Sequence, residues 1–243
     1  DKYPKRDGRC YIVGTDGKHN AEVLYRKIFR AGAFWMIRDQ VTGLWRAYQP
    51  WLPADVGRES EARPAPPLVS PKIMPRHHIA WENAKQQLPL IMRATTGWEI
   101  SFYSSKAKPP QGSDVDLVLF DEEIVDPEWY AEVAVRGIVD RKGRFLWTAT
   151  AQKGGAQFYE LYLTAQDERL KPNPRIVEFF AHVNDNPYFD DEQRTQFFSK
   201  LTEEQRRVRI AGEFAFTSFR VYPEFNRGTH VVDYQQIPSS WTR

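Results

Sequence analysis

Three consecutive carboxylates follow an apolar run near the middle of the chain. Leu117–Phe120 is wholly apolar, which predicts a buried strand, and it leads directly into Asp121, Glu122 and Glu123. Parallel α/β sheets bind their ligands at the carboxyl ends of their strands, where these side chains would lie. In nucleotide hydrolases an Asp at this place holds Mg²⁺ and the next Glu polarises the attacking water. The alternative is an acidic helix start that is stabilised by the helix dipole.

A second polar strand end follows about 25 residues later in the chain. The apolar run Phe145–Trp147 predicts another buried strand, and it ends in Thr148, Ala149 and Thr150. Hydroxyl groups at the tip of a neighbouring strand can contact the phosphate end of a nucleotide. Thr is also common in ordinary strands. The spacing of the two strand ends, however, is more specific than either one and favours a nucleotide site.

The remaining polar residues predict structural roles. The sequence from Gly14 to His19 contains Gly17 and Lys18, but it does not match G-x-x-x-x-G-K-[ST], because only two residues separate the glycines. We therefore reject it as a phosphate loop, and we expect Cys10 to lie in the core. The histidines show no metal-ligand spacing and are expected to be structural (His19, His77, His78, His182 and His230).

Composition bounds the class of protein. The 243 residues include 15 Phe, 11 Tyr and 8 Trp, which supply a large core, and the single cysteine excludes an internal disulfide. No apolar stretch approaches the roughly 20 residues that span a bilayer, so we expect no membrane segment. Residues 1–110 carry 18 Lys+Arg against 10 Asp+Glu, and residues 111–243 carry 16 against 22. The basic half is compatible with an anionic partner, although unevenly charged surfaces are common.

The order of the predicted elements indicates an α/β fold. Seven of the 17 prolines lie within residues 50–75, which predicts a long loop. We expect a mainly parallel sheet with helices on both faces and a helical C-terminal extension. The opening and closing residues suggest an internal segment of a longer polypeptide. Strands are predicted over 10–13, 88–93, 98–104, 117–120, 144–147, 175–183 and 230–233, and helices over 20–31, from Asp126, over 156–165, and after the capping residues Asp190 and Thr202.

Taken in order, these segments resemble the ATPase domain of the tailed-phage terminase large subunit, the motor that packages DNA. Asp121-Glu122-Glu123 is similar to its Walker B motif, and Thr148-Ala149-Thr150 to its coupling motif. Further similar segments are Tyr11–Gly14, Lys27–Phe29, His182–Tyr188, Gly212–Phe214, Val221–Pro223, Phe225, His230–Asp233, Ile237, Pro238 and Trp241.

This resemblance implies a RecA-like P-loop NTPase sheet that uses ATP and Mg²⁺. Asp121 would order Mg²⁺, Glu122 would activate water, and Thr148, Ala149 and Thr150 would contact the nucleotide and couple hydrolysis to motion. Residues 1–183 would form the ATPase core, and residues 184–243 the C-terminal part that leads towards a nuclease domain. The implied partners are double-stranded DNA, a portal protein, a small terminase subunit and further copies in a ring. The implied location is the host cytoplasm, at the procapsid portal.

Two departures from the family pattern bear on these expectations. The Walker A loop is not in this sequence, so it would have to lie upstream of Asp1. Gln111-Gly112 stands where the family often has Arg-Gly. In the family, that arginine can act as an arginine finger on the ATP of a neighbouring subunit. Lys106, Lys108 or Arg136 would have to replace that arginine. A helicase-like translocase, or a non-catalytic fragment that binds DNA or the portal, are the alternatives.

Overall fold

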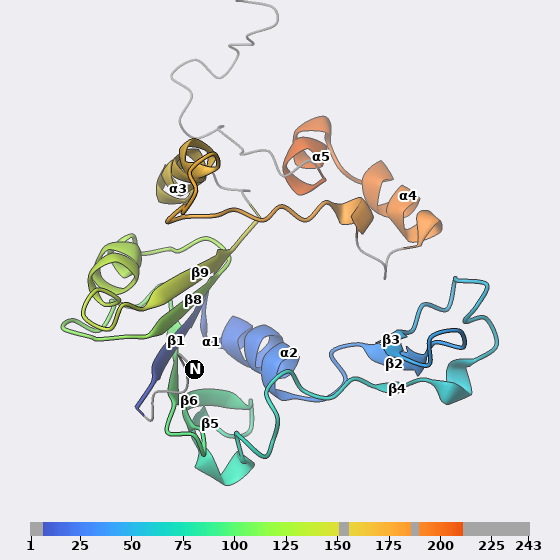
Figure 1. Cartoon of the computed structure of the whole chain (residues 1–243), viewed down its shortest axis with the longest axis horizontal. Coiled ribbons are helices and arrows are strands. Elements are labelled where there is room, and N and C mark those ends of the chain that lie inside the picture. The colour runs from blue at the N-terminus through green and yellow to red at the C-terminus, as the bar shows by residue number, and fades with distance from the viewer. Residues whose placement is uncertain (1–6, 151–155, 186–189, 211–243) are drawn as a thin grey trace, which may run out of the picture.

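Four parallel strands form the centre of the main sheet in the computed structural model, which describes residues 7–150, 156–185 and 190–210 (Figure 1). In spatial order they are β7 (Glu99–Ser104), β1 (Arg9–Gly14), β8 (Leu117–Asp121) and β9 (Arg144–Thr148). Beyond β7 the sheet continues antiparallel through β6 (Leu88–Arg93) and β5 (Ile79–Asn83). The predicted mainly parallel α/β sheet is confirmed. The predicted hairpin over 88–93 and 98–104 is also confirmed, and it corresponds to β6 and β7.

Helices cover both faces of this sheet, as predicted. On one face, α1 (Gly17–His19), η1 (Asn20–Tyr25) and α2 (Arg26–Phe29) follow one another without a break and pack Leu24 and Tyr25 against Ile12. On the other face, η4 (Tyr130–Arg136) and the preceding Trp129 pack against Val13, Val118 and Phe120. Because successive side chains of a strand point to opposite faces, neighbours Ile12 and Val13 enter different cores.

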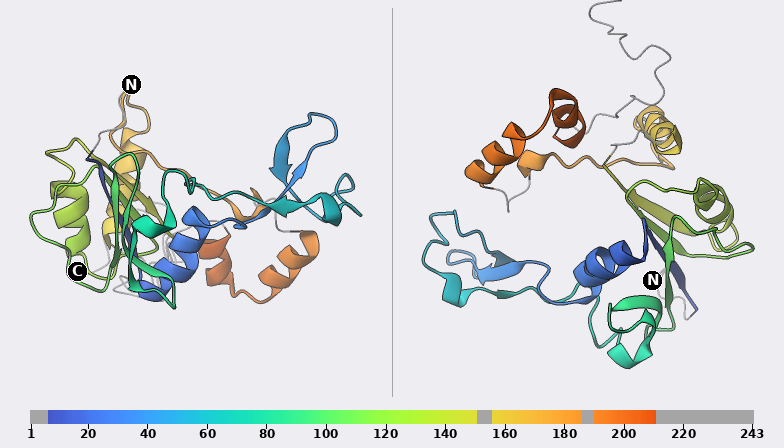
Figure 2. Two further views of the ribbon diagram at one scale, coloured as in Figure 1. Left: turned by 90° about the horizontal axis from the view of Figure 1, so that it is seen from below. Right: turned by 180° about the vertical axis from the view of Figure 1, so that it is seen from behind.

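A small separate sheet projects from the main body as an arm, which we define as residues 33–66 (Figures 1 and 2). Its strands, in spatial order, are β3 (Trp45–Ala47), β2 (Trp35–Arg38) and β4 (Arg63–Pro64). The 3-10 helix η2 (Glu59–Glu61) lies between β3 and β4, and η3 (Arg76–His78) follows the arm. The expectation that 50–75 has no regular structure was therefore wrong in part. Strands of two to four residues carry too little hydrophobic periodicity to be predicted.

The C-terminal part of the described chain is helical. It comprises α3 (Ala156–Glu168), η5 (Val183–Asp185), α4 (Asp191–Ser199) and α5 (Glu203–Arg209). Both predicted caps are confirmed, because Asp190 accepts a hydrogen bond from the Gln193 N–H and Thr202 forms a complete capping box with Gln205. The described helices include none that is both long and apolar enough to cross a bilayer.

The predicted strand over 175–183 is not present. Residues 177–182 have no regular secondary structure and pair with no strand of the described chain, and Phe179 is 90% exposed. The apolar run is typical of a strand, but a strand also needs a neighbour's free backbone groups, which the fold does not bring to this segment. The strand predicted over 230–233 lies outside the described residues.

Candidate functional site

The two predicted strand ends meet at the carboxyl edge of the main sheet. β8 and β9 are parallel and in register, with Asp121 opposite Thr148. The Thr148 hydroxyl donates a hydrogen bond to Asp121 Oδ1 at 2.6 Å. Ala149 and Thr150 follow at the end of β9 and are partly buried. The structure therefore brings together the Asp and the first Thr that the sequence had singled out 27 residues apart.

Glu122 has a backbone conformation that is unusual for its residue type. Its φ is +69°, in the left-handed region that favours glycine. β9 holds it there from both ends of the residue: the Glu122 N–H donates to the Thr148 carbonyl at 2.7 Å, and the Glu122 carbonyl accepts from Trp147 Nε1 at 2.9 Å. Such strain costs about 1–3 kcal/mol and clusters at functional sites. The helix that follows begins at residue 128, so the acidic triplet does not form its first turn.

His19 completes the site, although we had expected it to be structural. Its Nε2 lies 2.7 Å from Asp121 Oδ2, across 102 residues of sequence, and both side chains are largely covered, at 19% and 23% exposure. The helix begins three residues earlier than the predicted start at Asn20, and this places His19 in its first turn at the edge of the sheet. The signal that could have identified it is Asp16, a typical N-cap residue two positions after the end of a buried strand. We call Asp16, His19, Asp121, Glu122 and Thr148 the polar edge.

The first turn of this helix is fixed by its own hydrogen bonds. Asp16 Oδ1 accepts from the His19 N–H at 3.0 Å, and Asp16 Oδ2 accepts from Lys106 Nζ at 3.1 Å. These two bonds hold the pKa of the Asp16 carboxyl below its ordinary value. One residue further on, the Asn20 side chain donates to the Tyr103 carbonyl at 2.8 Å. The helix start is thereby joined to β7 as well as to β8.

Gly14 is expected to be essential for this close approach of helix and strand. A Cβ atom there would lie 2.3 Å from Asn20 Oδ1 and 2.8 Å from His19 Cδ2, so Gly14→Ala must displace the side chains of Asn20 and His19. Overpacking of this kind costs about 1–3 kcal/mol, which thermal or urea unfolding would measure. Gly17→Ala is the matched control, because its Cβ meets only the end of the Leu88 side chain, at 3.1 Å. Equal stability of the two variants would contradict this account.

The Asp121 carboxylate and the Thr148 hydroxyl are oxygen groups of the kind that Mg²⁺ prefers as ligands. The described residues contain no group of three or more His, Cys, Asp or Glu side chains arranged to hold a metal ion. Mg²⁺ needs no such cage, because it commonly binds through one or two carboxylates together with water and substrate phosphates. Asp121, with the Thr148 hydroxyl beside it, would hold the ion, and the ion would neutralise phosphate charge.

The three cations considered as replacements for the finger arginine already have partners. Lys106 pairs with Asp16, Lys108 pairs with Asp126 at 3.3 Å and Glu128 at 2.8 Å, and Arg136 pairs with Glu132 at 2.9 Å on its own helix. Of these, Lys106 is the one whose partner belongs to the polar edge. Gln111 is exposed in the loop before β8.

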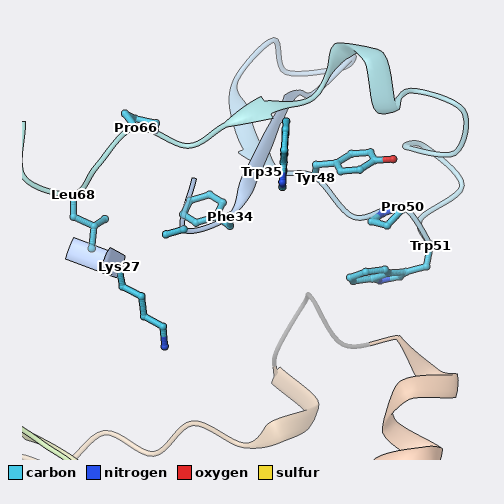
Figure 3. Close-up of a pocket in the computed structure, with 9 residues that line it drawn as sticks. Lys27, Phe34, Trp35, Tyr48, Pro50, Trp51, Pro66 and Leu68 are labelled. Atoms are coloured by element: carbon cyan, nitrogen blue, oxygen red, sulfur yellow. The ribbon is translucent and has the colours of Figure 1, made fainter. Parts of the chain in front are cut away.

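A pocket lies between the arm and α2 and includes no residue of the polar edge (Figure 3). Its volume is about 700 Å³, and Lys27 is its single charged lining residue. Aromatic rings and prolines form most of the remaining wall: Phe34, Trp35, Tyr48, Pro50, Trp51 and Pro66, with Ala33 and Leu68. None of these lining residues is a carboxylate or a histidine, so this pocket offers no acid–base group, in contrast to the polar edge.

Comparison with known proteins gives matches among solved structures. No protein-family model matches the sequence, and no curated protein does either. The large terminase ATPase domain of a Thermus phage matches at 15% identity and a TM-score of 0.45, over 86% of this chain and 77% of that one. An arginine-to-alanine variant of the same domain matches at 16% identity and a TM-score of 0.44, with the same coverage. Both matched structures are thus ATPase domains of a phage large terminase.

Proposed function

We propose that this chain forms the part of a terminase-type DNA-packaging ATPase that carries its catalytic carboxylates. Asp121 would order Mg²⁺, Glu122 would activate the attacking water, and Thr148, Ala149 and Thr150 would sense the nucleotide and couple hydrolysis to motion. The observation that carries the proposal is the in-register bond between Asp121 and Thr148, beside a Glu122 held in the left-handed region. Both observations support the proposal, because strained backbone clusters at functional sites and phosphoryl transfer depends mainly on positioning.

The phosphate-binding loop is proposed to come from a strand that pairs with β9. Among the described residues β9 is an edge strand of the main sheet, because it pairs with β8 alone. A strand at the edge of a sheet presents a row of unpaired backbone N–H and C=O groups, so this edge is suited to a further strand. A loop at the carboxyl end of such a strand would lie next to Thr148 and Asp121.

The test is ATP hydrolysis by the polypeptide that includes the coding sequence preceding Asp1. We expect hydrolysis that depends on Mg²⁺ and is stimulated by double-stranded DNA, with movement along the duplex but no unwinding. Strand displacement would favour a helicase-like translocase instead. If that sequence encodes no phosphate loop and nucleotide does not bind, the chain is a non-catalytic fragment and the proposal fails.

Contact with DNA is proposed to come from the basic half of the chain. Lys72, Arg76 and Lys85 are exposed around the β5–β6 end of the sheet, and within the described part of the chain none of them forms an ion pair. Each phosphate that they neutralise should contribute about 0.9 to the slope of log affinity against log salt. Replacing all three by Ala should therefore weaken binding equally for unrelated duplexes and flatten the slope by up to about 3. Titrations at several salt concentrations measure both, and an unchanged slope would exclude these residues.

The remaining partners follow from the proposed activity. A packaging motor would bind a portal protein and a small terminase subunit, act as a ring of identical subunits, and work at the procapsid in the host cytoplasm. Co-purification with a portal protein in the presence of ATP would test this part of the proposal separately from hydrolysis.

A further inference from the structure

Both oxygens of the Asp121 carboxylate are held by protein donors. Oδ1 accepts from the Thr148 hydroxyl at 2.6 Å, and Oδ2 lies 2.7 Å from His19 Nε2. Two bonds on opposite oxygens fix the rotation of the carboxylate about its last torsion. A carboxylate offers about four lone-pair sites, so two remain for further donors such as metal-bound water. The Asp121 carboxylate is therefore held in one orientation and can still accept further hydrogen bonds or bind a metal ion.

His19 is itself held firmly enough to orient another residue. Its backbone N–H is bonded to Asp16, Asp16 is bonded to Lys106, and the adjacent Asn20 is bonded to β7. Because Gly14 has no Cβ atom, the side chains of His19 and Asn20 can pack directly against the end of β1. The imidazole thus reaches Asp121 from a turn whose supporting hydrogen bonds do not involve β8 or β9.

We propose that His19 is a positioning residue, whose Nε2–H bond holds the Asp121 carboxylate in the orientation that receives the metal–nucleotide complex. The inference rests on the proposed function and adds a residue to it. Loss of the hydrogen-bond partners of metal-ligating carboxylates typically lowers metal affinity about 10–100-fold. Without His19, the Asp121 carboxylate would be held only at Oδ1, by the Thr148 hydroxyl.

The test compares four forms of the full-length polypeptide: wild type, His19→Gln, His19→Asn and His19→Phe. The Gln amide nitrogen is as many bonds from Cα as His Nε2, so His19→Gln retains a donor that reaches Asp121. The Asn amide is one carbon shorter, and Phe keeps the ring without a donor. Binding of Mn²⁺ in the presence of ADP, followed by the electron paramagnetic resonance signal of the free ion, reports the site without requiring hydrolysis.

We expect wild type and His19→Gln to bind Mn²⁺ alike, and His19→Asn and His19→Phe to bind it about tenfold more weakly. Thermal unfolding serves as the folding check, and the Gln–Asn pair keeps the comparison valid if the Phe variant does not fold. Equal binding by all forms would overturn the positioning role and leave the ATPase proposal intact. Weaker binding by His19→Gln as well would also overturn it, since ring packing would then be what matters. Failure of the wild type to bind Mn²⁺ with ADP would contradict the proposed function itself, and the inference with it.

Discussion

Glu122→Gln is expected to slow ATP hydrolysis by the full-length polypeptide about 10²–10⁴-fold while ATP remains bound. Glutamine has nearly the same shape but cannot take a proton from water. The backbone clamp on Glu122, formed by Thr148 and Trp147, does not involve the side chain, so the site should keep its geometry. Single-turnover hydrolysis and equilibrium binding of a fluorescent ATP analogue measure the two quantities separately.

Glu123→Gln is the matched control, because it removes the same charge one residue further along the chain. It should leave hydrolysis much closer to wild type. Glu122→Gly gives a second, independent check: it should be as inactive as Glu122→Gln, yet it should not be less stable, since glycine adopts a φ of +69° without strain. Equal losses in the Glu122→Gln and Glu123→Gln variants would show that the acidic cluster acts only through its charge.

Asp55→Asn is expected to destabilise the arm by about 3 kcal/mol, because it removes one partner of a buried ion pair. Asp55 is fully buried and accepts from two nitrogens of Arg46, at 2.6 and 2.5 Å, and from the Gln49 N–H at 3.0 Å. An Asn amide would turn a donor towards the guanidinium. The value lies at the lower end for buried pairs because the Arg46 side chain is 28% exposed and can regain some water.

The loss should be confined to the arm, which has its own small sheet. Amide hydrogen exchange should quicken in β2 and β3 and stay unchanged in β1 and β8. Glu61→Gln is the control, because Glu61 is 53% exposed where it pairs with Arg58, and the effect should be small. Quickened exchange throughout the main sheet would mean that the arm and the core unfold together.

The same carboxylate predicts how the stability of the arm depends on pH. The bonds from Arg46 hold the pKa of Asp55 below its ordinary value, so its stabilising contribution is complete above the unfolded-state pKa of about 4. It is lost as the pH falls through the lower, folded-state pKa. Exchange in the arm should therefore quicken with acid below about pH 4, after correction for intrinsic rates, and this response should be weaker in Asp55→Asn.

The elements of the core could be predicted because their signals are local. Continuous apolar runs marked β1, β8 and β9, and the capping residues at Asp190 and Thr202 marked α4 and α5. Strand 175–183 shows the limit of this reasoning. Its residues are typical of a strand, but strand formation depends on an available neighbour, which no local pattern encodes.

The sequence by itself determined which chemistry was available: an Asp–Glu pair and a Thr at the ends of two apolar strands, whose proximity follows from parallel pairing in register. Only the tertiary structure showed that His19 contacts Asp121. This contact depends on the residue at which the helix starts and on the absence of a side chain at Gly14, which leaves room for His19 at the edge of the sheet. The left-handed conformation of Glu122 was equally beyond the sequence, since bonds from β9 impose it against the preference of the residue. Only the tertiary structure likewise showed that Asp55 and Arg46 pair within the arm, with Asp55 fully buried.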